Sequence, residues 1–263
     1  MKLDGVGVVI TGAAGGLGSE LVRTLSGRGA RLVLLDRNQE ALQAQAAGLG
    51  GGATPIAVDL LDGEARNAAL QEAEQALGGI DLLLNNAGLM SFRPYAEEDP
   101  ALLERIVQLN MLAPMLACRQ VLPGMLARGR GRIVNIGSTF GTIGFAWFAA
   151  YSASKFGLRG FSEALRRELD GSGVGVTYVA PRAVRTPLNT GAVYRMAEAV
   201  KMNLDDPAWV ADQVIAAIEA DVKERHLGWP EKLFARLNAL LPALVDGALR
   251  KQNRVMEPFA RES

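Results

Sequence analysis

Tyr151 and Lys155 are the two residues of this chain whose spacing most directly suggests chemistry. They lie four positions apart in Tyr-Ser-Ala-Ser-Lys with no proline between them, so a helix would place both side chains on one face. A free tyrosine has a pKa of about 10 and stays protonated at neutral pH. A fixed cation favours the phenolate, so we expect Lys155 to lower the pKa of Tyr151 and make it a general acid/base. Ordinary solvated helices also carry such pairs, so other motifs must support this interpretation.

A glycine-rich turn separates the first expected strand from the first expected helix. It reads Thr11, Gly12, Ala13, Ala14, Gly15, Gly16, Leu17, Gly18. Glycines allow a tight turn and let a pyrophosphate approach the helix N-terminus, where free N–H groups and the helix dipole favour negative charge. We therefore expect a dinucleotide site that includes Thr11, Gly12, Gly16, Leu17 and Gly18.

Asp36 ends the second expected strand, where a carboxylate can accept hydrogen bonds from both hydroxyls of an adenosine ribose. The same carboxylate would repel the 2′-phosphate of NADP, so NAD is the favoured cofactor. Arg37 complicates this prediction, because a guanidinium just past the strand could bind that phosphate bidentately. NADP therefore stays the less favoured alternative.

Short apolar runs alternate with helical patterns, which predicts an α/β fold with a doubly wound parallel sheet and helices on both faces. A helix over residues 100–126 is apolar around most of its circumference. We expect it to pack against a second subunit or, alternatively, beneath the chain's own loops. A second helix should span residues 151–170, and one catalytic domain should span residues 1–229. The expected strands are residues 6–11, 31–36, 56–59, 80–85, 132–136, 174–179 and 224–229.

The composition excludes several classes of function. The 28 basic and 28 acidic residues cancel, which argues against nucleic acid and leaves a small molecule as the expected partner. Cys118 is the only cysteine, and with no charged and apolar leader at Met1 the expected location is the cytoplasm. His226 is the only histidine and has no acidic or cysteine partners at ligand spacing, so neither a metal site nor a serine–histidine triad is expected.

Four motifs occur in order along the chain. They are Thr-Gly-x-x-x-Gly-x-Gly at residues 11–18, Asn85-Asn86-Ala87-Gly88 after the fourth strand, Ser138, and Tyr151-x-x-x-Lys155. In this order and spacing they resemble the short-chain dehydrogenase/reductase family, over roughly residues 5–228. The resemblance implies a single-domain Rossmann-type fold that moves hydride between a nicotinamide and an alcohol or carbonyl carbon.

The resemblance also implies roles for individual residues. Tyr151 would exchange a proton with the substrate oxygen, Lys155 would lower its pKa and bond the nicotinamide ribose, and Ser138 would orient the same oxygen. Hydride delivery to a carbonyl builds oxyanion character that a hydroxyl and a phenol stabilise, so the residue chemistry agrees. Asp59 would meet the adenine amine, although a strand-end cap is an almost equally good interpretation. The remaining implied cofactor contacts are Asn86, Ala87, Gly88, Pro181 and Thr186.

Asn110 resembles the remaining catalytic member of the family, whose main-chain carbonyl holds a water in the proton path to the lysine. The sequence supplies a physical reason for this. Pro114 has no N–H and its ring crowds the carbonyl four residues earlier, which is that of Asn110. We therefore predict a kinked helix with a solvent-bonded carbonyl at Asn110.

The chain departs from the family pattern after the sixth strand, where the usual Pro-Gly is replaced by Pro181-Arg182. Arg182 and Arg185 could face solvent, bind the cofactor diphosphate or recognise an acidic group on the substrate, and we favour the first two roles. Apolar residues near this point could form a substrate wall beneath a mobile segment over residues 190–203, or simply be core. These residues are Phe145, Trp147, Phe148, Tyr194 and Met196; the candidate substrate contacts are Ser138, Phe145, Phe148, Tyr151 and Arg182.

Residues 230–263 continue beyond the core motifs with leucines at helical spacing, among them Leu233, Leu237 and Leu241. No stretch of this extension approaches the roughly 20 apolar residues of a spanning helix, so no transmembrane segment is expected. We expect a helical extension docked on its own subunit or on a partner. A pocket cover and an interfacial anchor are the alternatives.

Taken together, these patterns predict an NAD-dependent oxidoreductase that interconverts a secondary alcohol and a ketone on a fairly apolar small molecule, assembled as a homodimer or homotetramer. The enzymatic alternative is an NADPH-dependent 3-oxoacyl reductase. The alternative of another class is a nicotinamide-binding sensor without turnover. The complete set of Asn110, Ser138, Tyr151 and Lys155 argues against the sensor, because cofactor binding alone requires neither the serine nor the phenol.

Overall fold

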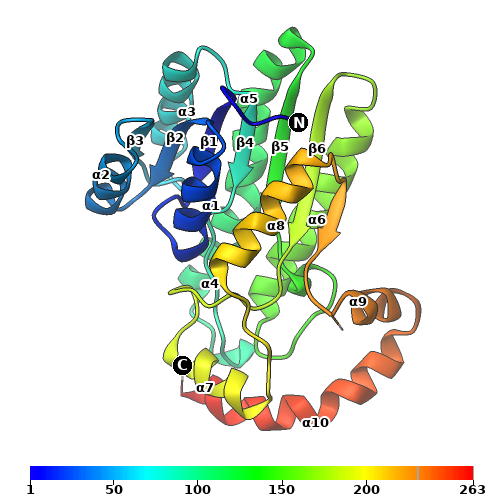
Figure 1. Cartoon of the computed structure of the whole chain (residues 1–263). Coiled ribbons are helices and arrows are strands. Elements are labelled where there is room, and N and C mark those ends of the chain that lie inside the picture. The colour runs from blue at the N-terminus through cyan, green and yellow to red at the C-terminus, as the bar shows by residue number, and fades with distance from the viewer. Residues whose placement is uncertain (230, 263) are drawn as a thin grey trace.

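Strands and helices alternate along the chain and wind into one seven-stranded sheet (Figure 1). The computed structural model describes residues 1–229 and 231–262. All neighbouring strands are parallel, in the order β3-β2-β1-β4-β5-β6-β7, which confirms the predicted doubly wound parallel sheet. The strands are β1 (Gly7–Thr11), β2 (Arg31–Asp36), β3 (Ala53–Ala57), β4 (Leu82–Asn85), β5 (Gly131–Ile136), β6 (Val174–Ala180) and β7 (Glu224–His226).

The third strand begins earlier in the sequence than predicted. Apolar character suggested residues 56–59, whereas β3 starts at Ala53 and pairs with β2. Because β3 is an edge strand with mostly exposed or half-buried side chains, it needs no continuous apolar run. The edge position also accommodates Pro55, which has no N–H to donate to a ladder.

Helices cover both faces of the sheet. Helices α1 and α8 pack over one face, and α3, α5 and α6 over the other (Figure 1). Helix α2 packs at the β3 edge of the sheet. The bounds are α1 (Gly16–Ser26), α2 (Gln39–Gly48), α3 (Gly63–Leu77), α4 (Pro100–Val107), α5 (Ala113–Arg128), α6 (Ala149–Glu168), α7 (Gly191–Ala199) and α8 (Pro207–Glu219).

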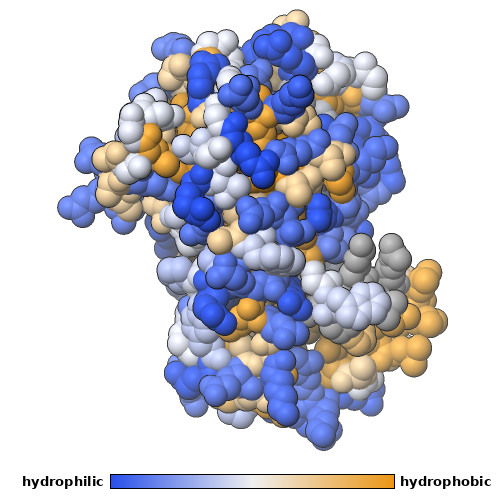
Figure 2. All heavy atoms as spheres, viewed as in Figure 1, coloured by the Kyte–Doolittle hydropathy of each residue, from blue (hydrophilic) through white to orange (hydrophobic). Residues whose placement is uncertain are grey.

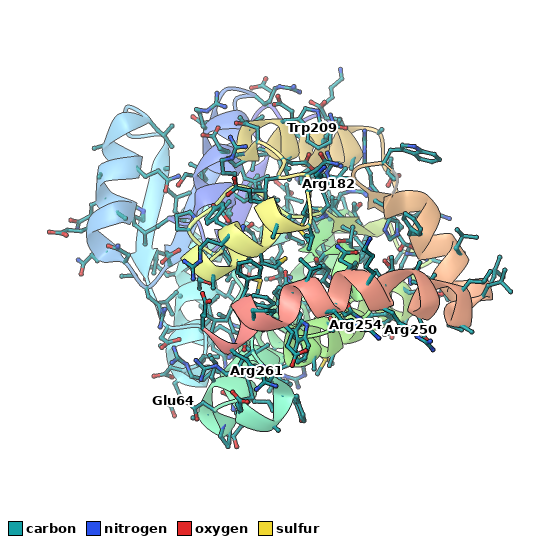
Figure 3. The ribbon with its side chains drawn as sticks, turned by 90° about the horizontal axis from the view of Figure 1, so that it is seen from below. Glu64, Arg182, Trp209, Arg250, Arg254 and Arg261 are labelled. Carbon is teal, nitrogen blue, oxygen red and sulfur yellow. The ribbon has the colours of Figure 1, made fainter. Side chains whose placement is uncertain are left out.

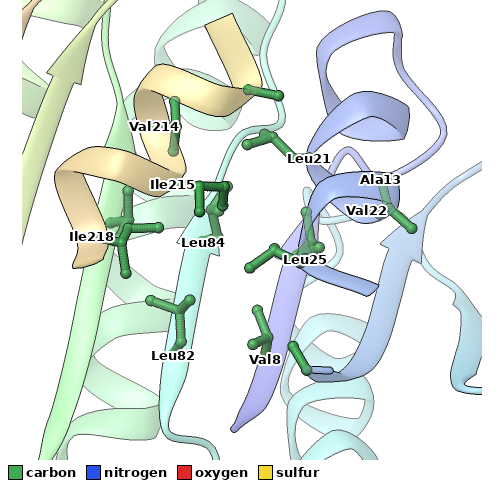
Figure 4. Packing of buried hydrophobic residues seen from close by; sticks show 14 of the residues in the cluster. Val8, Ala13, Leu21, Val22, Leu25, Leu82, Leu84, Val214, Ile215 and Ile218 are labelled. Carbon is green, nitrogen blue, oxygen red and sulfur yellow. The ribbon is translucent and has the colours of Figure 1, made fainter. Parts of the chain in front are cut away.

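Alternating side chains along the strands build the two halves of the core. In β1, Val8 points toward α1 and α8, whereas Val9 points toward α3 and α5. Figure 4 shows Leu25 of α1 and Ile218 of α8 gathered over the central strands with Leu84 of β4. Burying each such side chain contributes roughly 1.5–3 kcal/mol relative to exposure. The sheet is therefore a firm platform for the loops at its carboxyl edge.

The helix predicted over residues 100–126 consists of three consecutive segments: α4, a π-helical turn η2 (Gln108–Leu112), and α5. Val121 and Met125 of α5 point into the core, while Leu112 and Leu126 are exposed. By length and composition this run is the one helix of the described residues that could cross a membrane. Because its inner face belongs to the core, we interpret it as a core helix whose outer surface mixes apolar side chains with charged ones, such as Arg105 and Arg119.

Two helices follow the last strand, α9 (Glu231–Leu240) and α10 (Pro242–Arg261). Pro230, Ser263 and the side chain of Leu233, all part of the predicted extension, lie outside the described structure. Helix α10 crosses below the carboxyl edge of the sheet and packs against α7 (Figure 3). Met256 and Ala260 of α10 are fully buried in this contact.

Polar contacts tie α10 to segments on both sides of it. Arg195 of α7 pairs with Glu262 at 2.8 Å, and Arg261 pairs with Glu97 of the short helix η1 (Tyr95–Glu97) at 2.9 Å. Exposed pairs of this kind contribute little individually. The buried apolar contacts therefore dominate the docking.

The turn between α9 and α10 is not covered by the rest of the chain. Exposed apolar side chains gather there (Figure 2), namely Leu240, Leu241 and Leu244.

Candidate active site

The carboxyl ends of β1 and β4 lie where the strand order reverses, which is where doubly wound sheets open a crevice. A cavity of about 410 Å³ begins there and extends past the ends of β5 and β6. Thr11, Asn110 and Phe145 do not line it, although the sequence analysis included them in the site. The predicted residues that do line it are Gly12, Gly16, Leu17, Gly18, Asp36, Arg37, Asp59, Asn86, Ala87, Gly88, Ser138, Phe148, Tyr151, Lys155, Pro181, Arg182 and Thr186.

Glycine is required in the turn after β1 for both conformation and space. Gly12 has a φ of +66°, a region that favours glycine, and a Cβ there would lie 2.7 Å from Cα of Ala87. A Cβ on Gly18 would lie 2.0 Å from the carbonyl oxygen of Gly12. The turn therefore closes tightly against the N-terminus of α1. No side chain caps this terminus at Gly15, so its N–H groups are available to a phosphate.

Thr11 and Asn86 join the first turn to the loop after β4. The Thr11 hydroxyl accepts hydrogen bonds from the N–H groups of Asn86 and Ala87, at 3.0 and 3.2 Å. The Asn86 side chain donates back to the carbonyls of Thr11 and Gly12. These contacts hold the two loops together, so Thr11 acts from behind the cavity by positioning them.

The carboxylates at the ends of β2 and β3 already accept hydrogen bonds from the backbone. Asp36 accepts from the Ala14 N–H at 3.1 Å, which orients one oxygen toward the glycine turn. Asp59 accepts from the Leu61 N–H at 3.0 Å and also lines the cavity. Both interpretations of Asp59, a cap and a cofactor contact, are thus compatible with its position. Arg37 lines the cavity beside Asp36 with an exposed side chain.

Ser138, Tyr151 and Lys155 converge at the inner end of the cavity. Ser138 follows β5, and its hydroxyl accepts a hydrogen bond from the Phe140 N–H at 3.1 Å and interacts with the Tyr151 phenol. Helix α6 carries Tyr151 and Lys155 on one face, and both are buried. The Lys155 ammonium lies 5.7 Å from the centre of the Tyr151 ring and donates to the Ile136 carbonyl at 2.9 Å.

The electrostatics of this pair differ from the sequence-based expectation. We predicted that Lys155 lowers the pKa of Tyr151, whereas burial raises the pKa of Tyr151 to about 12, and the hydrogen bond with Ser138 offsets only part of this. Burial likewise lowers the pKa of Lys155 to about 8. Desolvation outweighs attraction because the ammonium bonds a carbonyl instead of the phenol oxygen. In the cofactor-free protein Tyr151 is therefore firmly protonated at neutral pH.

Asn110 lies within the π-helical turn η2, so the helix departs from α-helical geometry just ahead of Pro114, at the point where a kink was predicted. Its fully buried side chain accepts from the Leu89 N–H at 2.7 Å and donates to the Leu89 carbonyl at 2.8 Å. It also donates to the Ser154 hydroxyl on α6. Asn110 thus braces the loop after β4 against the helix that carries Tyr151. The predicted water on its carbonyl stays a prediction.

Arg182 has a role that the sequence analysis did not consider. Its guanidinium forms a bidentate ion pair with Asp205, with contacts of 2.9 and 2.7 Å, and it also donates to the Trp229 carbonyl. Both side chains of the pair are largely buried. Although Arg182 lines the cavity, its charge is compensated by Asp205, which weakens the predicted role in recognising an acidic substrate. Arg185 is exposed.

Aromatic side chains form one wall of the cavity, and the sequence analysis identified only part of it. Phe140 lines the cavity and was missed, since it lies in the short helix η3 (Thr139–Gly141) with no periodic pattern to mark it. Its ring packs edge-to-face against those of Phe148 and Tyr151, with ring centroids 4.9 and 5.9 Å away. Phe145 stacks on Phe140 with ring centroids 4.6 Å apart but does not itself line the cavity, although it was predicted to contact the substrate.

Of the other predicted wall residues, one lines the cavity and two make contacts elsewhere. Met196 lines the cavity, whereas the Tyr194 hydroxyl donates to the Thr186 carbonyl at 3.0 Å. Trp147 adopts a φ of 72°, rare for a bulky residue, and its indole N–H donates to the Asn253 carbonyl of α10. The segment predicted to be mobile, residues 190–203, contains helix α7.

Comparisons with known proteins match this geometry to a family. The short chain dehydrogenase family matches residues 7–196. The chain belongs to the short-chain dehydrogenase/reductase family. It is 32% identical over 253 residues to dehydrogenase/reductase SDR family member 7B of Bos taurus, covering 90% of this chain and 78% of the relative. It is 36% identical over 227 residues to ketoacyl reductase HetN of a Nostoc strain, covering 84% and 78%.

A solved structure supports the same assignment. The short chain dehydrogenase/reductase from Burkholderia phymatum, in complex with NAD, superposes with a TM-score of 0.83 at 25% identity, covering 93% of this chain and 96% of that one. This short-chain dehydrogenase/reductase is therefore an oxidoreductase enzyme of a family that binds NAD(P).

Replacing Gly18 by alanine should abolish cofactor binding, because its Cβ would meet the Gly12 carbonyl at 2.0 Å and force the turn open. Titration of NADH fluorescence should show at least about a 100-fold loss of affinity, or about 2.7 kcal/mol. Gly48→Ala is the matched control, since nothing lies within 4 Å of a Cβ in that position at the end of α2. Normal NADH binding by Gly18→Ala would contradict the assigned phosphate turn.

Replacing Lys155 by methionine should change how stability depends on pH. Because the pKa of Lys155 falls from 10.5 to about 8 on folding, the unfolded chain binds more protons between these values, and wild-type stability should rise with pH through this window. Relative to Lys155→Met, the wild-type free energy of unfolding should rise by about 2 kcal/mol from pH 8 to pH 10 in cofactor-free protein. Urea unfolding measures this. Lys251→Met, at an exposed position, is the control. Parallel curves for Lys155→Met and wild type would refute the depressed pKa.

Proposed function

We propose that this protein is an NAD-dependent oxidoreductase that interconverts a secondary alcohol and a ketone on a fairly apolar small molecule. The observation that carries the proposal is the convergence of Ser138, Tyr151 and Lys155 on one cavity that also holds the glycine turn. A hydroxyl, a phenol and an ammonium are the groups that a carbonyl requires when it becomes an alkoxide. Their position beside a dinucleotide turn links this chemistry to hydride transfer.

The cavity fits a dinucleotide in ways that depend on this chain's own residues. Gly12 and Gly18 let the turn close tightly, because a Cβ at either position would collide with backbone atoms, and the uncapped start of α1 offers N–H groups to a diphosphate. Asp36 is oriented by Ala14 toward the same turn and would accept hydrogen bonds from a ribose. A bound reduced cofactor supplies the hydride.

In the reductive direction Tyr151 acts as the acid. Its pKa of about 12 keeps the phenol protonated until negative charge develops on the substrate oxygen. Ser138 is oriented by the hydrogen bond that its hydroxyl accepts from the Phe140 N–H, which places this hydroxyl beside Tyr151, where it would donate to the same substrate oxygen. Lys155, held by the Ile136 carbonyl, supplies a positive charge from a buried position, where electrostatic interactions are stronger than in water. This charge favours the phenolate as the proton leaves Tyr151.

Apolar side chains support the proposal of an apolar substrate. Next to Tyr151 the cavity is lined by Phe140 and Phe148, and α7 adds Val193 and Met196. Arg182 does not change this character because Asp205 compensates its charge. A ketone with aliphatic or aromatic substituents matches such a wall.

A second candidate is an NADPH-dependent 3-oxoacyl reductase. The exposed side chain of Arg37 lies beside Asp36, where a 2′-phosphate would be, and the relative HetN is named a ketoacyl reductase. We favour NAD because Asp36 is aligned with the ribose position by a backbone hydrogen bond and would repel that phosphate. The presence of Ser138 and Tyr151 in the cavity argues against a sensor without turnover, because cofactor binding alone requires neither the serine nor the phenol.

We further propose a homodimer or homotetramer in the cytoplasm. The exposed apolar side chains of the α4–α5 run, Leu112 and Leu126, support a subunit contact, as does exposed Phe156 on α6. The single, buried, free Cys118 is consistent with a reducing compartment.

Replacing Tyr151 by phenylalanine should abolish ketone reduction, because the ring keeps its packing while the acid is lost. We expect kcat to fall by about 10³-fold or more in an NADH-oxidation screen against aliphatic, aromatic, steroidal and acyl-thioester ketones. NADH affinity should stay within about threefold of wild type. Turnover by Tyr151→Phe at the wild-type rate would exclude the proposed acid, and inactivity of the wild type on every class would favour the sensor.

The cofactor preference should depend on Asp36. Wild type should bind NADH at least about tenfold more tightly than NADPH, and Asp36→Ala should remove or reverse this preference by deleting both the ribose contact and the repulsion. Fluorescence titration of both reduced cofactors measures this. Glu40→Ala, an exposed change on the neighbouring helix α2, should leave the ratio unchanged. Tighter binding of NADPH by wild type would instead support the acyl reductase.

A further inference from the structure

Tyr178 lies directly behind the proposed catalytic serine. It belongs to β6 and is 1% exposed. Tyr178 is not one of the residues that line the cavity. Its phenol oxygen lies 3.4 Å from both the backbone nitrogen and the carbonyl oxygen of Ser138. A tyrosine buried inside a parallel sheet must place its hydroxyl against a polar partner. Here that partner is the backbone of the residue that would orient the substrate.

Two glycines on either side of Ser138 make room for this phenol. A Cβ on Gly137 would lie 2.1 Å from the Tyr178 hydroxyl, and a Cβ on Gly141 would lie 2.4 Å from it. Neither glycine has a positive φ, so backbone conformation does not require glycine there. Space for Tyr178 is the physical reason for Gly137 and one of two reasons for Gly141, whose Cβ would also lie 2.8 Å from the Lys155 carbonyl oxygen. The Tyr178 phenol therefore occupies a slot built around the turn that carries Ser138.

The phenol also completes the hydrogen bonding of this turn. The Ser138 N–H has no other acceptor within the described part of the chain, whereas its carbonyl also accepts from the Gly141 N–H at 2.9 Å. Ser138 itself is extended, with φ −166° and ψ 160°, and sends its hydroxyl toward Phe140 N–H and Tyr151. Removing the Tyr178 hydroxyl would leave a buried N–H unpaired at the base of the serine.

We propose that Tyr178 is a positioning residue for the reaction, whose phenol holds the Ser138 backbone so that the serine hydroxyl and Tyr151 reach the same substrate oxygen. This inference rests on the proposed function of Ser138. Tyr178 touches neither the cavity nor the substrate, so it acts only through Ser138. It adds a second tyrosine to the site, with a structural task distinct from the acid role of Tyr151.

Deleting the hydroxyl tests the proposal in two independent ways. Tyr178→Phe should lower kcat for ketone reduction about tenfold while NADH affinity stays within about twofold. In cofactor-free protein it should also speed hydrogen exchange of the Ser138 amide at least about tenfold, a readout that needs no substrate. Tyr95→Phe, at a position that is 62% exposed, is the matched control and should change neither quantity.

The space around the phenol gives a second test, which stays informative even if a single variant folds poorly. Gly137→Ala should impair turnover severely through its collision with the phenol, and Tyr178→Val in the same chain should restore it to the level of Tyr178→Val alone. Multiplicative losses in the double variant, or an unchanged kcat and Ser138 exchange rate in Tyr178→Phe, would overturn the proposal. A wild type without ketone reduction would instead remove the proposed function, while the exchange measurement would still decide the contact between Tyr178 and Ser138.

Discussion

Burial of a phenol and an ammonium at the same end of one helix is the constraint on which this active site depends. Desolvation moves the two pKa values in opposite directions, so that Tyr151 holds its proton more tightly and Lys155 less tightly. The carbonyl of Ile136 at the end of β5 fixes the ammonium, so the position of the positive charge is set by the central sheet. A protonated phenol beside a buried, fixed cation is what the proposed donation of a proton to an alkoxide requires.

The surrounding loops are held in place by one another. Thr11 binds the backbone of the loop after β4, Asn110 binds both polar groups of Leu89 in the same loop, and it reaches Ser154 on the catalytic helix. The glycine turn, the β4 loop and α6 are therefore linked by side chains that are themselves outside the cavity. Preorganisation of this kind allows the reacting groups to act without rearranging in the transition state.

Motifs and periodicity predicted the architecture and the placing of Tyr151 and Lys155 on one helix face, because these features depend on local spacing. The alternation of apolar runs located every strand boundary to within three residues. The largest errors are the start of β3, whose exposed edge position removes the apolar signal, and the end of β7, which stops at His226 although residues up to 229 were predicted. Contacts between residues distant in the sequence could not be predicted from it. The ion pair of Arg182 with Asp205 joins segments 23 positions apart, and no local pattern marks it. The raised pKa of Tyr151 was also missed, since burial depends on packing, whereas sequence spacing reveals only the neighbouring charge.

The same distinction explains why the motifs define the chemistry without defining the substrate. Val193 and Met196 of α7 line the cavity, and behind them lies Met256 of α10, more than 50 positions further along the chain and fully buried. A bulkier substrate would have to displace α7, and α7 is backed by α10, which is in turn tied to η1 and to Trp147. Cavity size on the substrate side is thus a property of a packed unit that includes the C-terminal helix. Because closely packed interiors transmit changes in volume, substitutions in α10 can alter which substrate fits the cavity.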